Sequence, residues 1–135
     1  MRAIRRGLTS GEHGLPLIGS GDWNDGMNLV GQEGKGESVW LALFMCDVLT
    51  RFSGIARLRR DFDFGKQCER EVERLRRSIE EHGWDGEWYL RAFFDDGTPL
   101  GSAESRECRI DSIAQSWSVL SGAGSMTWRL RAVSK

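Results

Sequence analysis

The segment Gly19–Asn28 concentrates the side chains with the most chemical potential in this sequence. Asp22, Trp23, Asn24 and Asp25 follow one another directly, and the glycines around them let the backbone approach a ligand closely. Carboxylates bind sugar hydroxyls or donate a proton, and an indole offers a flat apolar surface on which a pyranose ring can lie. The pattern therefore indicates carbohydrate chemistry. The alternative is a glycine-rich turn whose acids bond backbone amides while Trp23 fills the core.

Metal and thiol chemistry are not expected. The order Asp-Trp-Asn-Asp differs from that of an Asp-x-Asn-x-Asp calcium loop, and no glutamate stands at the required offset. Two histidines do not suffice for a histidine-rich zinc site, and three widely spaced cysteines fit neither a disulfide framework nor a zinc site. We expect no metal, no cofactor, structural cysteines and a reducing, cytoplasmic location.

Composition excludes two further classes of protein. The 135 residues carry 19 basic and 20 acidic side chains, with a net charge of -1, so the basic surplus of a nucleic-acid binder is missing. The most apolar stretch, Val39–Leu49, is interrupted by Asp47 and is shorter than the roughly 20 residues that cross a membrane. A chain of this length suits one modest domain.

The elements that must position the Gly19–Asn28 segment are mainly helical. Residues 7–37 are rich in glycine and lack helical periodicity, which indicates a long structured loop. Residues 84–101 alternate aromatic side chains with turn signals and predict short extended pieces. We expect a nearly all-apolar buried helix over 37–52, a one-faced amphipathic helix over 61–82 ended by Gly83, a helix over 111–120, and a fraying tail over 125–135.

For several side chains the sequence allows either a packing role or a functional role. Glu37 is predicted as a first-turn helix charge rather than a ligand, and Arg109 as a partner in a structural ion pair. Trp40, Trp84 and Trp88 are predicted to pack in the core or in loops. Trp117 could stack on a ligand, but its helical spacing with neighbouring apolar residues suits a core indole equally well.

Several long motifs resemble the catalytic domain of glycoside hydrolase family 94, over about residues 12–124. The likeness is to the phosphorylase-like domain of cyclic β-1,2-glucan synthases in particular. The motifs occur in the family's order and are Gly14–Asn28, Gly36–Trp40, Gly83–Tyr89, Phe94–Gly101 and Arg109–Gly122.

The resemblance implies a fold and a set of site residues. Members of the family are inverting phosphorylases, or their relatives, built on an (α/α)6 barrel of six helical hairpins whose loops form the active site. By this likeness Asp25 is the general acid that protonates the leaving glycosidic oxygen. Asp22 and Trp23 match positions lining the sugar subsite, and Gln115 and Trp117 match a second active-site segment.

The implied chemistry is consistent with a single acidic residue. In inverting phosphorolysis inorganic phosphate is the nucleophile, so the second carboxylate of a hydrolase is not needed. Asp25 must then be protonated at working pH, which requires burial or a neighbouring anion. Asp22 and the incoming phosphate are the candidates for that anion.

The family domain is several times longer than this chain, so residues 1–135 are interpreted as one fragment of it, a partial (α/α)6 barrel with long active-site loops. The first hypothesis is a phosphorylase-like fragment that converts β-linked glucan and phosphate to glucose 1-phosphate. The alternative is a catalytically inactive remnant that binds oligosaccharide, and a plain helical interaction module would leave Asp22–Asp25 unexplained. Exposed helix faces predict self-association or pairing with the rest of the parent domain.

Overall fold

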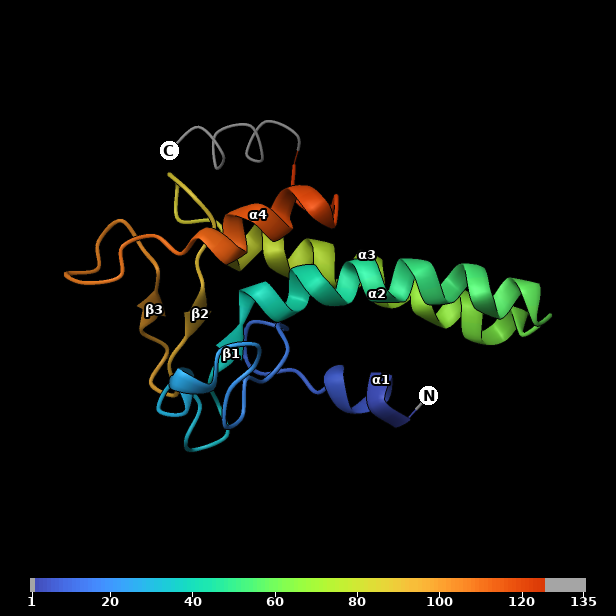
Figure 1. Ribbon diagram of the computed structural model, residues 1–135, viewed down its shortest axis with the longest axis horizontal. Helices are drawn as coiled ribbons and strands as arrows, with labels where there is room; N and C mark the ends of the chain where they lie inside the picture. The colour runs from blue at the N-terminus through green and yellow to red at the C-terminus, as the bar shows by residue number, and fades with distance from the viewer. Residues whose placement is uncertain (1, 126–135) are drawn as a thin grey trace.

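The computed structural model describes residues 2–125 and is mainly helical, as predicted (Figure 1). The tail expected to fray lies outside the described residues, apart from Ser125. The partial barrel stays a prediction. The elements are α1 (Arg2–Gly7), η1 (Asp25–Met27), β1 (Glu37–Ser38), α2 (Val39–Leu58), α3 (Phe62–His82), β2 (Ala92–Phe93), β3 (Pro99–Leu100) and α4 (Ser112–Leu120).

Helices α2 and α3 form a long antiparallel hairpin, which is the scaffold of the fold (Figure 1). Helix α2 begins after Ser38, whose Oγ accepts the N–H of Leu41 at 2.9 Å. Helix α3 begins after Asp61, whose side chain caps it by accepting the N–H of Phe64 at 3.2 Å. The connection turns at Arg60, whose φ of 61° lies in the left-handed region. The prediction for α3 is confirmed.

The prediction for α2 was wrong at both ends. Glu37 belongs to β1 and not to the first helical turn, because Ser38 takes the N-cap position. At the other end the helix runs six residues beyond position 52, to Leu58. Side chains in this extension include Ile55 and Leu58, which are exposed, so the apolar pattern weakens there although the helix does not stop.

The hydrophobic core lies between α2 and α3 and extends under α4. The apolar residues on the facing sides of the two hairpin helices are buried, and α4 packs across α2 through buried Ala114 and half-buried Trp117. The central members are Leu43, Cys46, Leu49, Cys68, Leu75 and Ile79. Burial raises the pKa of the Cys46 thiol to about 12, so this thiol is inert at neutral pH, in agreement with a structural role.

A small antiparallel sheet in the order β1-β2-β3 connects the hairpin to the long loop that precedes it. In its register Glu37 lies opposite Phe93 and Ser38 opposite Ala92, which confirms extended pieces in the 84–101 segment. The glycine-rich loop curls beside β1 (Figure 1). Asp95 fastens it to the sheet by accepting three backbone N–H groups, those of Glu33, Lys35 and Gly36, at 2.8–2.9 Å.

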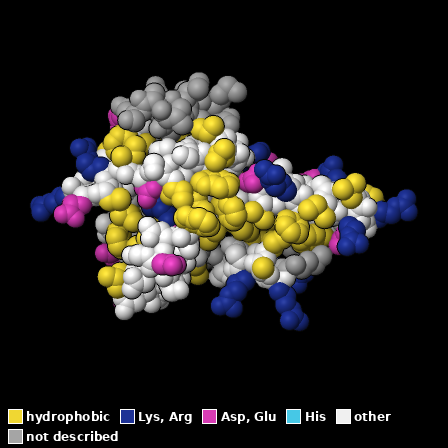
Figure 2. Space-filling view, viewed as in Figure 1, with side chains coloured by type: hydrophobic (Ala, Val, Ile, Leu, Met, Phe, Trp, Pro, Cys, Tyr) yellow, Lys and Arg dark blue, Asp and Glu magenta, His cyan; other side chains and the backbone are white. Residues whose placement is uncertain are grey.

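Helix α2 is apolar on more than its buried side. Figure 2 shows hydrophobic side chains gathered over the α2 part of the visible face. Exposed apolar residues of the hairpin and of α4 are Phe52, Ile55, Leu58, Phe62, Val119 and Leu120. By length and composition alone α2 could span a membrane, but half of its most apolar window is buried inside the protein, which is the position of a core helix.

Candidate functional site

Asp22 is the most tightly bound residue of the sequence-predicted site. Its two carboxylate oxygens accept both terminal nitrogens of Arg91, at 2.5 and 2.8 Å, and Ser38 Oγ donates to it at 2.6 Å. The Asn24 N–H adds a longer bond at 3.4 Å. The Asp22 side chain is 1% exposed, so its oxygens are occupied by the protein itself.

This environment lowers the pKa of Asp22 below its ordinary value of 3.8. Burial acts in the opposite direction and is the largest single influence, since it penalises the charged carboxylate. The hydrogen bonds from Arg91 and Ser38, together with the positive charge of Arg91, outweigh it. Asp22 is therefore an ionised, compensated carboxylate, and it does not supply a free negative field to Asp25.

This lowered pKa predicts a loss of stability in acid. A carboxylate with a depressed pKa in the folded state stabilises the protein fully above its unfolded pKa, and this contribution is lost as the pH falls through the folded value. The free energy of unfolding from urea titrations should therefore drop as the pH falls below 3.8. In Asp22→Asn the drop should be shallower, whereas Asp47→Asn, which removes an exposed ion pair with Arg51, should keep the wild-type slope. An unchanged slope in Asp22→Asn would contradict the assignment.

Asp25 and Trp23 point in a different direction from Asp22. Asn24 caps η1 by accepting the Gly26 N–H at 2.9 Å, and Asp25 begins this short helix with its side chain exposed. Trp23 is 75% exposed, which rules out the alternative in which it fills the core. Both residues line an open hollow of about 460 Å³, whose other lining residues are Asn24, Arg91, Asp111 and Ile113.

An aromatic cluster extends from this hollow across α2 to α4. The ring centroid of Trp23 lies 6.5 Å from that of Trp40, which stacks on Phe44 at 5.4 Å. Trp117 meets both Trp40 and Phe44 edge-on, at 6.4 and 5.1 Å. Trp117 thus packs in this cluster while staying half-buried, so both of its predicted roles remain open, and the packing predicted for Trp40 is confirmed.

Gln115 lies in the core beneath the hollow rather than on its wall. Its Oε1 accepts the N–H of Tyr89 at 2.9 Å, and its Nε2 donates to the carbonyls of Tyr89 and Asp111 at 2.7 and 3.0 Å. The side-chain amide therefore bonds three backbone groups. These contacts hold the strand that leads into β2 against α4, and the predicted contact between Gln115 and substrate stays untested.

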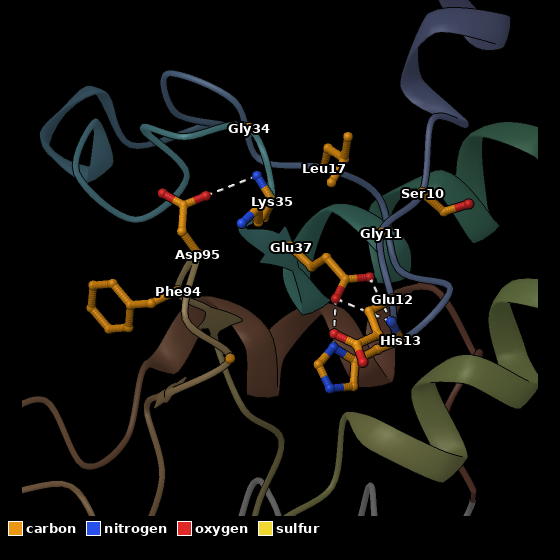
Figure 3. Close-up of a pocket in the computed structure, with 11 residues that line it drawn as sticks. Ser10, Gly11, Glu12, His13, Leu17, Gly34, Lys35, Glu37, Phe94 and Asp95 are labelled. Carbon is orange, nitrogen blue, oxygen red and sulfur yellow. Dashed lines mark hydrogen bonds and ion pairs between the residues drawn. The ribbon is translucent and has the colours of Figure 1, made fainter.

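A second cavity, of about 260 Å³, lies between the glycine-rich loop and the sheet (Figure 3). One of its lining residues is Glu37, which is buried, with 2% of its surface exposed. The Glu37 carboxylate accepts the backbone N–H groups of His13 and Leu15 and pairs with His13 Nδ1 at 2.5 Å. The His13 ring in turn stacks on Phe93 at 4.1 Å. Figure 3 shows Lys35 and Asp95 on the opposite side of the same cavity.

Three residues that organise the site were not anticipated as such, namely Arg91, Ser38 and Glu37. The charged partners Arg91 and Asp22 are 69 positions apart in the sequence, so no local spacing points to the pair. Arg109 donates its Nε to the Ala103 carbonyl instead of forming the expected ion pair. Within residues 2–125 no group of three or more metal-binding side chains occurs.

The structure is that of a mainly helical chain with an open hollow beside Trp23 and Asp25. The family model described as the catalytic domain of the glycosyl hydrolase 94 superfamily matches residues 1–134, and the chain belongs to that family. This finding agrees with the resemblance of the sequence motifs.

Curated relatives support the same assignment. The chain is 55% identical over 124 residues to the cyclic beta-(1,2)-glucan synthase NdvB of Rhizobium meliloti. The matched segment is 92% of this chain and 4% of that protein. It is 39% identical to a solabiose phosphorylase of Paenibacillus borealis, over 83% of this chain and 15% of that protein. It is 40% identical to a cellobionic acid phosphorylase of Neurospora crassa, over 92% of this chain and 16% of that protein. The chain thus spans only a small part of each relative's length.

Proposed function

We propose that this chain carries the acid loop, residues 22–27, and a sugar-contacting surface of a phosphorylase-like domain that acts on β-linked glucans, with inorganic phosphate as co-substrate. The observation that carries the proposal is the pairing of exposed Trp23 with exposed Asp25 at one open hollow. Family membership and the phosphorylases among the relatives favour phosphate as acceptor. The 55% identity to a β-1,2-glucan synthase favours β-1,2-linked glucose as the sugar.

In the proposed reaction Asp25 transfers its carboxyl proton to the glycosidic oxygen as the bond between that oxygen and the anomeric carbon breaks. A phosphate oxygen forms the new bond to the anomeric carbon from the opposite face, which yields α-glucose 1-phosphate and a glucan shortened by one unit. Asp22 takes no part in this step, because both of its carboxylate oxygens are bonded to Arg91.

A second function is supported by the exposure of Asp25. Its carboxyl group is in contact with water, outside the closed, water-excluding surroundings in which catalytic groups commonly act. In this alternative the 135-residue chain binds oligosaccharide through Trp23 without turning it over. Binding is common to both functions, so it is tested first, and turnover separates them.

The Trp23→Ala variant tests binding. An aromatic contact is worth about 1 kcal/mol, so its loss should weaken binding of β-1,2-linked glucooligosaccharides about fivefold or more, measured by calorimetry. The free energy of unfolding should change by less than about 0.5 kcal/mol, because the indole is mostly exposed. Leu29→Ala, at a residue that is 68% exposed in the same loop but outside the hollow, is the matched control and should bind as the wild type does. Equal binding by the Trp23→Ala variant and the wild type would remove the hollow as the sugar site.

A further inference from the structure

The five sequence-predicted site residues fall into two groups, and one side chain joins them. Asp22, Trp23 and Asp25 belong to the acid loop, whereas Gln115 and Trp117 belong to α4. Arg91, directly before β2, is 1% exposed and pairs with Asp22 of the acid loop and with Asp111, the N-cap residue of α4. Together with Trp23 and Asp25 it lines the open hollow.

On the acid-loop side the contact is bidentate. Both terminal nitrogens of Arg91 donate to Asp22, and Nη1 also reaches Ser38 Oγ at 3.3 Å. Asp22 accepts the Asn24 N–H, and the Asn24 side chain caps the turn that begins at Asp25. The position of Asp25 thus depends on the guanidinium group through two hydrogen bonds, the one between Asn24 and Asp22 and the one between Gly26 and Asn24.

On the α4 side the contacts close a ring. Arg91 Nε lies 3.4 Å from Asp111 Oδ2, and Asp111 caps α4 by accepting the Ile113 N–H at 2.9 Å. The Asp111 carbonyl accepts Gln115 Nε2, and Gln115 bonds both backbone groups of Tyr89, two residues before Arg91. The guanidinium also lies over the Trp40 ring, 5.6 Å from its centroid.

We propose that Arg91 is a positioning residue, which acts through Asp22 and Asp111 to hold the acid loop and the start of α4 in one fixed relation. The inference rests on the proposed function, in which this fixed arrangement presents Asp25 and Trp23 to a glucan. A planar fork that bonds both oxygens of one carboxylate, while its Nε lies within ion-pair distance of a second carboxylate, cannot be reproduced by lysine, whose ammonium is a point charge.

The test uses Arg91→Lys in the 135-residue chain, with ¹⁵N relaxation of Asn24, Asp25 and Gly26 as the first measurement. The charge is kept and the fork is lost, so the order parameters of these three amides should fall from the rigid range of about 0.85 toward 0.6. Amide exchange in α3 should stay as in the wild type. Affinity for β-1,2-linked glucooligosaccharides should fall on the order of tenfold, the scale on which lost supporting contacts act at other sites.

Arg74→Lys is the matched control. Arg74 also joins a helix to the glycine-rich loop, through the Gly14 carbonyl at 2.7 Å. It pairs with Glu71 of its own helix and has no hydrogen bond or ion pair with the acid loop among the described residues. It should leave the three order parameters unchanged. If Arg91→Lys does not fold, Asp22→Glu replaces it, because this change keeps the charge pair and displaces the acid loop by one methylene.

The outcomes separate this inference from the proposed function. Unchanged order parameters at residues 24–26 in a folded Arg91→Lys or Asp22→Glu variant would overturn the positioning role, whatever the chain binds. Equal mobility in the Arg74→Lys control would overturn it as well, since the effect would then be general loosening. Absence of glucan binding by the wild-type chain would instead refute the proposed function, and the relaxation measurement needs no sugar.

Discussion

Replacing Asp25 by asparagine is expected to lower phosphate-dependent release of glucose 1-phosphate by about 10²–10⁴-fold, the usual contribution of a general acid. Asparagine keeps the size and the exposed position of the side chain but has no carboxyl proton to transfer to the leaving oxygen. Substrate affinity should change little, because Trp23 and the hollow remain. The assay is run on the chain itself and on a chimera in which it replaces the matching segment of the 55% identical synthase.

The leaving group gives this prediction a sharper form. In a nitrophenyl β-glucoside the nitrophenolate leaving group departs without protonation. The Asp25→Asn variant should therefore lose far less activity on this substrate than on a glucan. Asp63→Asn, an exposed acid in the first turn of α3, is the matched control and should behave as the wild type does. Phosphorolysis of glucan that survives in Asp25→Asn would contradict the general-acid assignment. Binding without turnover in every form would favour the oligosaccharide-binding alternative.

Local sequence signals predicted the elements that depend on neighbouring residues. Asp61 and Asp111 stand directly before α3 and α4 and cap them, and Gly83 ends α3 with its N–H bonded to the Ile79 carbonyl. Capping and apolar spacing act over three to five residues, so they are visible in the chain. The short helix α1, with Ile4 as its single buried side chain, gives no such pattern and was not predicted.

The supports of the candidate site could not be found in this way, because they are pairs of distant residues. The sequence places Asp22 beside Trp23 and suggests that both serve a sugar, but Asp22 faces inward to Arg91 while Trp23 faces solvent. Arg91 follows Leu90 in a segment that reads as an apolar extended piece, and only the register of β2 with β1 brings it to Ser38 and Asp22. Tertiary pairing therefore decides which carboxylate is buried in an ion pair and which is exposed at the hollow.

Glu37 gives the largest expected effect on stability. Its carboxylate is buried and accepts the N–H groups of His13 and Leu15 as well as the His13 ring, and thereby holds the start of the glycine-rich loop against β1. Glu37→Ala leaves these donors buried without an acceptor, so the free energy of unfolding should fall by about 3–5 kcal/mol in urea titrations.

Glu37→Gln should lower the free energy of unfolding by less, because one acceptor oxygen remains while the new amide group opposes a backbone N–H. The matched control is Glu73→Ala, which removes an exposed carboxylate 3.4 Å from Arg76 and should change the free energy by less than about 1 kcal/mol. A loss as small as that of the control in Glu37→Ala would mean that the His13–Glu37 contact adds nothing to the fold. The large loss would instead show that Glu37 holds the start of the glycine-rich loop against β1, next to Ser38, which bonds Asp22 further along the same loop.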